Sequence, residues 1–179
     1  MRLFIAIPIK NTIEIKLFQN QLREQIKYSR VKWVEQENFH LTLKFIGETQ
    51  EFYINAINLI LSEINKKLLL PNLKTAHFDY FGSKKQISTL LLKIEEESNL
   101  IALQNVLEKN LEELGFEKNR HSYIPHLTIG RIKYYKYQDN IPELFKKFNI
   151  QSISLELGKP GLYKSTLTEK GPVYERLSD

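Results

Sequence analysis

Apolar residues recur along the chain with two different periods, and these periods predict a mixture of helices and strands. Apolar positions three or four residues apart are typical of the buried face of a helix. They predict helices at residues 11–26, 51–68, 98–114 and 142–148. Short apolar runs and alternating apolar positions predict strands. These lie at residues 2–9, 40–46, 74–81, 87–94, 124–132, 150–157, 162–168 and 173–177.

Turn residues mark several of the connections between these elements. Pro71 predicts the end of the second helix, and Gly115 predicts the end of the third. The segment FGSKKQ, which contains Gly82, predicts a hairpin turn between two strands. Mixed helices and strands with hairpin connections favour an α+β fold with largely antiparallel sheets. No Gly-, Ser- or Pro-rich linker divides the sequence, so we expect a single domain over residues 1–179.

Two of the predicted strands carry nearly the same four residues. HLTL occupies positions 40–43 and HLTI occupies positions 126–129, so the two copies start 86 positions apart. The chain has four histidines in all, and half of them therefore stand in this one setting. The comparable positions of the two copies suggest an old duplication folded into one body.

In the first of these strands, alternation predicts which side chains share a face. Successive side chains of a strand point to opposite sides of the sheet. His40, Thr42 and Lys44 are therefore expected on one face. Phe45 and the Leu residues of the tetrad are expected on the other face, in the core. The strand would present an imidazole beside a hydroxyl.

The second strand repeats this arrangement with one further candidate. His126 and Thr128 share a face, and the apolar residues between them face the core. Strict alternation puts Arg131 on the face opposite His126. A β-bulge at Gly130 would re-aim it, and Arg131 would then be a good phosphate clamp.

Several kinds of catalytic site are disfavoured by the residues present. His121 and His126 are five positions apart rather than four, and Thr is a poor zinc ligand, so the tetrads do not resemble a metal site. There is no G-x-S-x-G nucleophile elbow, no Gly-rich phosphate loop and no cysteine. The sequence therefore disfavours metal-dependent, serine and cysteine hydrolases.

Two histidines and two hydroxyls suit cleavage of a phosphodiester without a metal ion. In-line displacement at phosphorus needs one group to take a proton from the nucleophile and another to protonate the leaving oxygen. With a reference pKa of about 6.5, one imidazole can be neutral and the other charged near neutral pH. Thr42 and Thr128 can donate hydrogen bonds to the phosphate oxygens, on which negative charge grows.

The paired H-x-T-x motifs resemble those of the two-histidine (2H) phosphoesterase superfamily. Within it, MRLFIAIPI, VKWVEQENFHLTLKFIGE and YIPHLTIGR resemble the bacterial and archaeal RNA 2′,3′-cyclic phosphodiesterases, once called 2′-5′ RNA ligases. The resemblance covers essentially the whole chain. It implies a bilobal α+β fold, with two largely antiparallel sheets, outer helices and a central cleft. It also implies hydrolysis of a terminal 2′,3′-cyclic phosphate to a 2′-phosphate, with His40 as proton donor to the leaving 3′ oxygen and His126 as the group that activates water.

Composition narrows the expected partners and location. A net charge of +5 fits an anionic ligand without requiring one. The lack of cysteine suits the cytoplasm, and no apolar run is long enough to span a bilayer. We expect a cytoplasmic monomer without a cofactor or bound metal, acting on RNA 3′ ends or nucleoside 2′,3′-cyclic phosphates. A 2′,5′-oligonucleotide phosphodiesterase, a small cyclic-nucleotide hydrolase and a catalytically silent RNA-binding module are the alternatives.

Other residues are open to two interpretations. RIKYYKYQ, which starts at Arg131, interleaves basic and aromatic residues, as in a single-strand RNA groove or an exposed amphipathic loop. Trp33 and Phe39 are candidates either for stacking on a base or for the core. His77 and His121 are expected to be structural or surface residues.

Overall fold

The computed structural model describes residues 1–68, 72–95, 98–148, 152–169 and 171–178. The strands are β1 (Arg2–Pro8), β2 (Arg30–Trp33), β3 (His40–Glu48), β4 (Leu73–Ser83), β5 (Gln86–Ile94), β6 (His126–Tyr134), β7 (Ser154–Leu155), β8 (Gly161–Thr168) and β9 (Gly171–Arg176). The α-helices are α1 (Ile13–Gln25), α2 (Tyr53–Lys67), α3 (Ser98–Glu113) and α4 (Ile141–Lys147). Two 3-10 turns, η1 (Gln36–Asn38) and η2 (Tyr137–Asp139), complete the described elements.

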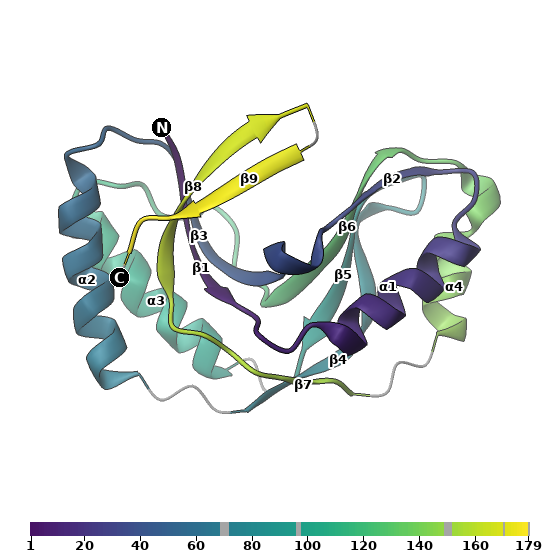
Figure 1. Ribbon diagram of the computed structural model, residues 1–179, viewed down its shortest axis with the longest axis horizontal. Helices are drawn as coiled ribbons and strands as arrows, with labels where there is room; N and C mark the ends of the chain where they lie inside the picture. The colour runs from purple at the N-terminus through teal and green to yellow at the C-terminus, as the bar shows by residue number, and fades with distance from the viewer. Residues whose placement is uncertain (69–71, 96–97, 149–151, 170, 179) are drawn as a thin grey trace.

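The strands form one antiparallel sheet, and its two halves meet where β3 pairs with β6. The strand order is β7-β4-β5-β6-β3-β1-β8-β9, and β2 pairs with the free side of β6. At the centre, β3 and β6 share the single register pair Leu41–Leu127. Figure 1 shows two lobes on either side of this junction. We call them the β3 lobe (β1, β3, β8, β9, α2, α3) and the β6 lobe (β2, β4–β7, α1, α4). The expected α+β fold with two lobes is confirmed.

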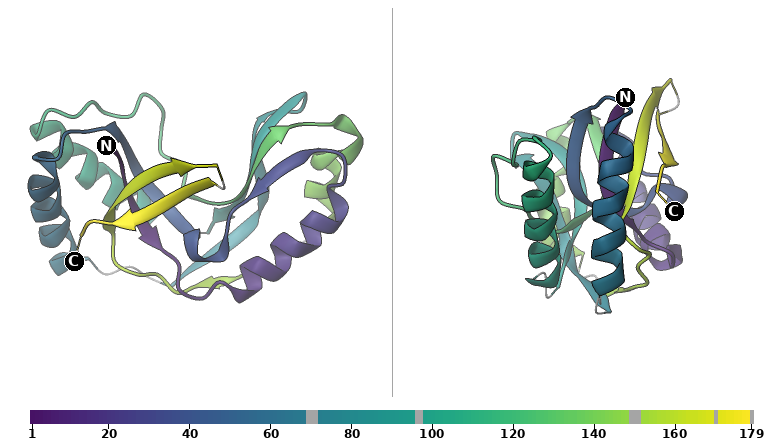
Figure 2. Two further views of the ribbon diagram at one scale, coloured as in Figure 1. Left: turned by 45° about the horizontal axis from the view of Figure 1, so that its top comes forward. Right: turned by 90° about the vertical axis from the view of Figure 1, so that its left-hand side faces the viewer.

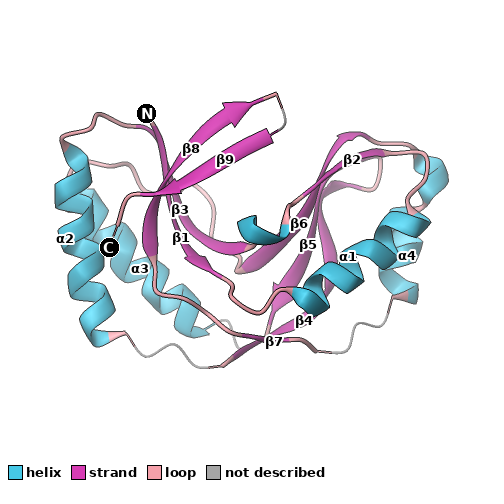
Figure 3. Ribbon diagram, viewed as in Figure 1, coloured by secondary structure: helices cyan, strands magenta, loops and turns pink. Residues whose placement is uncertain are grey.

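The helices lie on the outer sides of the two lobes (Figure 3). The chain passes back and forth between the lobes, so a helix and the tetrad strand that follows it lie in different lobes. Helix α1 precedes β3 in the sequence but lies on the β6 lobe, whereas α3 precedes β6 and lies on the β3 lobe (Figures 1 and 2). Each lobe is thus assembled from both halves of the chain. Neither tetrad strand is covered by the helix that immediately precedes it.

Most predicted elements are present, with two differences. The four helices are confirmed, because their apolar faces are buried; in α3 these residues are Leu100, Leu103, Leu107 and Leu111. Strand β2 was missed. Strand β7 covers only Ser154–Leu155, and residues 150–151 of the predicted strand lie outside the described part of the chain. Pro71 also lies outside it, and α2 ends at Lys67. No helix among the described residues is both long and apolar enough to cross a bilayer.

The two tetrad strands each contain a β-bulge at the last residue of the tetrad. In β6, Leu91 pairs with Thr128 but Leu90 pairs with Gly130, so β6 has one extra residue. Ile129 and Gly130 are consecutive buried positions, and alternation restarts one residue late. A Cβ at Gly130 would lie 2.9 Å from Val31 Cγ1, so the neighbouring β2 requires glycine here.

The bulge in β3 overturns one prediction from alternation. Ala6 pairs with Thr42 but Ile5 pairs with Lys44, so Leu43 and Lys44 are consecutive buried positions. Lys44 was expected beside His40, yet its side chain is only 3% exposed and faces α3. Phe45 was expected in the core, yet it is 60% exposed. Both predictions were wrong for the same reason, because one extra residue reverses the facing of all that follow.

Candidate active site

The pairing of β3 with β6 brings the two histidines together. His40 and His126 each begin their strand, immediately before the paired residues Leu41 and Leu127. They are close enough for a charge on His126 to lower the pKa of His40. The two imidazoles predicted from the tetrads therefore belong to one site, at the junction of the lobes.

Each imidazole is held by the same hydrogen bond. Nδ1 of His40 lies 2.7 Å from the carbonyl oxygen of Asn38, and Nδ1 of His126 lies 2.7 Å from that of Ile124. A carbonyl oxygen can only accept, so Nδ1 carries the hydrogen in both rings. Nε2 is then the atom that gains or loses a proton. The backbone two residues upstream fixes both the tautomer and the orientation of each ring.

Aromatic rings surround the histidines and remove water from them. The ring centroids of Phe4 and Tyr174 lie 5.3 and 5.4 Å from that of His40, and the ring of Phe81 lies 4.8 Å from His126. Burial, assisted by the charges of Arg131 and His126, lowers the pKa of His40 to about 4. Burial also lowers the pKa of His126. Both imidazoles are therefore neutral at pH 7 in the free protein.

The two threonines lie where alternation predicts, because they come before the bulges. Thr42 and Thr128 are half-buried, and each is separated from its histidine by a buried leucine. Thr128 lines a small cavity of about 80 Å³ together with His40 and Arg131. A hydroxyl and an imidazole on one strand face are arranged to contact the same ligand.

Arg131 reaches the site because of the β6 bulge. It lines both the small cavity and an adjoining one of about 1040 Å³, and His40 lines both as well. Its positive charge lowers the pKa of both histidines, in agreement with this position near them. The predicted candidates His40, His126, Thr128 and Arg131 are thus brought together.

The β8–β9 hairpin supplies residues that the sequence did not indicate. Pro172 and Tyr174 line both cavities, opposite Lys32 of the β6 lobe. Burial raises the pKa of the Tyr174 hydroxyl, so it is a neutral hydrogen-bond donor. No spacing or motif distinguishes these positions in the sequence. They reach the cleft only because β9 is the last strand on the β3 side of the sheet.

Most of the other candidates lie away from the site, whereas Trp33 borders it. Phe39 is buried in the core and His77 and His121 are exposed, in agreement with their structural or surface interpretation. Trp33 lines the small cavity with Arg23 stacked 5.4 Å from its ring centroid. The first part of RIKYYKYQ borders the larger cavity, through Arg131 and Lys133. Its last part lies against the segment before β2, because the backbone N–H of Lys136 donates to the Ser29 hydroxyl at 2.9 Å, and Asp139, which follows the motif, accepts hydrogen bonds from the backbone of residues 27–29.

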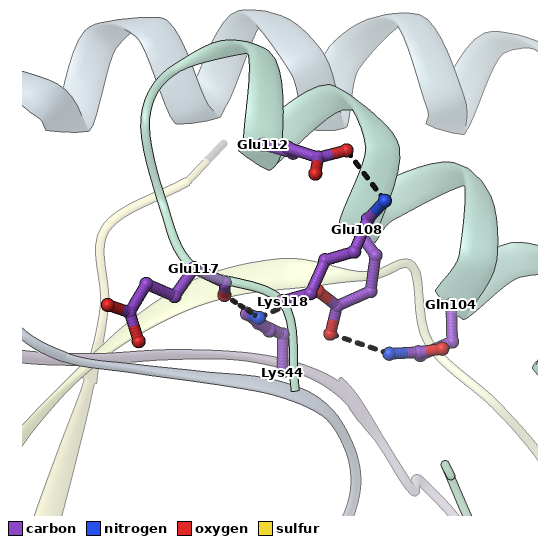
Figure 4. Close-up of polar contacts among 6 residues, drawn as sticks. All are labelled: Lys44, Gln104, Glu108, Glu112, Glu117 and Lys118. Atoms are coloured by element: carbon purple, nitrogen blue, oxygen red, sulfur yellow. Dashed lines mark hydrogen bonds and ion pairs between the residues drawn. The ribbon is translucent and has the colours of Figure 1, made fainter. Parts of the chain in front are cut away.

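The β3 bulge is fixed by a buried ion pair (Figure 4). Lys44 Nζ lies 2.7 Å from a carboxylate oxygen of Glu108 on α3, and it also donates to the carbonyl of Glu117 at 2.7 Å. The other carboxylate oxygen of Glu108 accepts from Gln104 at 2.8 Å. These contacts satisfy the buried charges and hold Lys44 away from the cleft.

The β6 bulge is fixed by a buried amide instead. Gln19 of α1 is 0% exposed, and its Nε2 donates to the carbonyls of Val34 at 2.8 Å and Ile129 at 2.9 Å. Ile129 is the first residue of the bulge. Gln19 therefore ties α1 to the backbone two residues before Arg131.

Comparisons with known proteins agree with this geometry. A sequence profile of the 2′-5′ RNA ligase superfamily matches residues 13–164. The RNA 2′,3′-cyclic phosphodiesterase of Methanocaldococcus jannaschii is 35% identical to this chain over 181 residues, which cover 100% of this chain and 99% of that protein. The protein of the same name from Thermotoga maritima is 32% identical over 179 residues, covering 99% of this chain and 93% of that protein.

Solved structures share the fold. The protein TT0787 of Thermus thermophilus superimposes with a TM-score of 0.73 at 22% identity, covering 99% of this chain and 96% of that one. E. coli LigT complexed with 3′-AMP superimposes with a TM-score of 0.68 at 20% identity, covering 98% and 94%. The bilobal arrangement is therefore found in experimental structures.

Proposed function

The chain belongs to the 2′-5′ RNA ligase superfamily, and from this premise we propose that it hydrolyses the 2′,3′-cyclic phosphodiester at RNA ends to a 2′-phosphomonoester. One observation carries the proposal. Two imidazoles on adjoining strands have Nδ1 engaged with a backbone carbonyl at the same distance of 2.7 Å, which leaves both Nε2 atoms for proton transfer. Full-length relatives named for this activity support it.

Each histidine has one task in the reaction. His126 Nε2 takes a proton from water as the water oxygen bonds to phosphorus, and the bond from phosphorus to the 3′ oxygen breaks. His40 Nε2 gives its proton to that leaving oxygen. This division of roles follows the family resemblance, because the two hydrogen-bond settings are alike. Proton exchange with solvent then restores both rings. No metal ion is needed for these steps.

Because the pKa of His40 is low, the acid becomes protonated only when the substrate is bound. With a pKa of about 4, His40 is neutral at pH 7 before substrate binds. An anionic phosphate beside the ring favours the imidazolium and raises this pKa. The carbonyl of Asn38 accepts from Nδ1 and also favours the charged ring. Substrate binding therefore loads the acid with its proton.

The remaining side chains hold the phosphate. Thr42 and Thr128 donate to its non-bridging oxygens, where charge increases in the transition state. Arg131 supplies a fixed positive charge and a planar donor set. The two lobes act as one unit, since neither contains a complete set. We place the protein in the cytoplasm, as a monomer acting on RNA ends.

The test is product analysis with nucleoside 2′,3′-cyclic monophosphates and with RNA ending in a 2′,3′-cyclic phosphate, in the presence and absence of EDTA. We expect 2′-monophosphates, at a rate that EDTA does not change. A 3′-phosphate product would contradict the assigned leaving oxygen. Loss of turnover with EDTA that a divalent ion restores would contradict the metal-free mechanism. Turnover of 2′,5′-linked oligonucleotides alone would identify the other phosphodiesterase class.

A further inference from the structure

One flank of the cleft is lined by cations that lack carboxylate partners among the described residues. Arg2, Arg30, Lys32 and Lys133 line the larger cavity together with Arg131, and its single acidic lining residue is Glu169. None of these five cations forms an ion pair in the described part of the chain. Lysines elsewhere do pair, as Lys10 does with Glu156 and Lys146 with Glu143. Positive charge that is unbalanced within a concave surface attracts anions strongly.

Four of these cations lie on two paired strands that border the cavity. Arg30 and Lys32 are alternate residues of β2, and Lys32 pairs with Arg131 of β6. The register shifts between Arg30 and Val31, so Arg30 pairs with Tyr134, the neighbour of Lys133. Alternate residues of a strand share a face and lie about 6.6 Å apart, a repeat that suits successive phosphates of an extended single strand.

The opposite wall offers an aromatic surface. Phe45 is 60% exposed and lines the same cavity from β3. Single-strand binding surfaces combine a positively charged groove with aromatic side chains on which bases stack. The cavity of about 1040 Å³ lies at the upper end of the range for drug-sized ligands, about 300–1,000 Å³. One terminal nucleotide beside His40 leaves much of this space for its neighbour.

We propose that this flank is a subsite for the RNA nucleotides preceding the terminal cyclic phosphate. Arg30 and Lys133 bind the phosphates of this segment, and Phe45 stacks on one of its bases. The RNA then leaves the histidines past β2 and the β8–β9 hairpin, since Lys93, beside His126 on the other flank, is paired with Asp79. The inference rests on the proposed function and adds a preference for polynucleotide over mononucleotide substrates.

The test compares a cyclic mononucleotide with a short RNA that ends in a 2′,3′-cyclic phosphate. In the double variant Arg30→Gln/Lys133→Gln, we expect the ratio of kcat/KM for RNA to that for the mononucleotide to fall about tenfold. The slope of log kcat/KM against log salt should become shallower by about 0.7 for each lost phosphate contact. The double variant Lys146→Gln/Lys147→Gln removes the same two positive charges on α4 and should leave the ratio unchanged. An unchanged ratio in the double variant would overturn the subsite.

Phe45 gives an independent measurement. Phe45→Ala should lower the same ratio about fivefold or more, because stacking contributes about 1–3 kcal/mol per base. Phe45→Tyr keeps an aromatic face and should restore it. Fluorescence anisotropy with an unreactive 3′-hydroxyl RNA of the same length separates binding from catalysis. Weaker binding in Phe45→Ala and in Arg30→Gln/Lys133→Gln supports the subsite even if no cyclic phosphate is hydrolysed, and unaltered binding overturns it.

Discussion

Strands β3 and β6 are alike up to their bulges and differ beyond them. Both hold a histidine through a carbonyl two residues upstream, and both place a threonine on the same face. Five positions after the histidine, β3 turns Phe45 toward the cleft and β6 turns Arg131 toward it. The settings of the two proposed proton-transfer groups are therefore alike, whereas the groups proposed to bind substrate differ between the strands. A repeated motif can supply the two proton-transfer groups, while the residues that follow it determine on which side each part of the substrate binds.

The supports of the two bulges also differ. Lys44 of β3 is itself buried and needs the carboxylate of Glu108. In β6 the residue at the bulge is glycine, and Gln19 donates to the backbone. An ion pair that loses one member leaves a buried charge behind, but an amide that is removed leaves only polar backbone groups. Removal of the support should therefore lower the free energy of unfolding more for β3 than for β6.

Substitution of the histidines tests whether the two strands contribute equally to proton transfer, and it should have the largest effect on turnover. His40→Ala and His126→Ala should each lower turnover by about 10² to 10⁴, the range for a general acid or base. The double variant should lose much less than the product of the two, because both act on one transition state. Steady-state kinetics with a cyclic mononucleotide gives these values. One fully active single variant would defeat the assignment.

The β3 support can be broken by Lys44→Met. The variant leaves the carboxylate of Glu108 buried without its partner, so the free energy of unfolding should fall by about 3 to 5 kcal/mol. Urea denaturation measures it. The double variant Lys44→Met/Glu108→Leu removes both charges and should recover most of the loss. If the single variant is as stable as the unmodified protein, the ion pair does not hold this strand.

Thr42 and Thr128, which precede the bulges, test whether the two strands also bind the phosphate alike. Thr42→Ala and Thr128→Ala each remove one hydrogen bond to the phosphate. Turnover should fall by about 10² to 10³ if the bond strengthens as charge develops. If it is equally strong in the ground state, KM rises instead. The melting temperature should hardly change, since neither side chain is in the core. Activity lost only through a large drop in melting temperature would point to a structural role.

Arg131 tests the difference between β3 and β6 beyond their bulges. Arg131→Ala should lower kcat/KM about tenfold to a hundredfold, because hydrogen bonds to a charged group contribute about 1.5–3 kcal/mol. Gln19→Met keeps the shape of Gln19 but removes its donor, so it should reduce kcat/KM by a smaller factor. In combination with Arg131→Ala it should add little. Gln104→Met is the control, since that amide supports Glu108 and not a tetrad strand. Additive losses would show that Gln19 does not act through Arg131.

The sequence predicted the helices and the first residues of each tetrad strand well, because these depend on local rules. The helices follow from apolar spacing, and the facing of His40 and Thr42 follows from alternation. The facing of Lys44 did not follow, because its partner Glu108 is 64 residues away. A lysine in a strand is normally exposed, and nothing near it indicates a bulge. Strand β2 was missed because its four residues gain strand structure only by pairing with β6.

Tyr174 shows a second limit of the same kind. Its ring lies 5.4 Å from that of His40, although the two are far apart in the sequence. Only the strand order β3-β1-β8-β9 brings β9 to this place. Spacing along the chain contains no information on that order. Gly130 was different, because a glycine in a strand is a known sign of a bulge; the sequence offered a bulge here as one of two possibilities, and the structure has it.

The pH dependence of turnover, with EDTA present, tests the two-histidine account most directly. We expect a bell-shaped profile for kcat/KM with both limbs below pH 6.5, since burial lowers the pKa of both imidazoles in the free protein; protonation of His126 sets the acid limb and loss of the His40 proton sets the alkaline limb. The pKa values seen in kcat should be higher than those in kcat/KM, because bound phosphate stabilises the imidazolium. A rate that climbs steadily from about pH 5 to about pH 9 would mean that one histidine does not transfer a proton, and it would contradict the account.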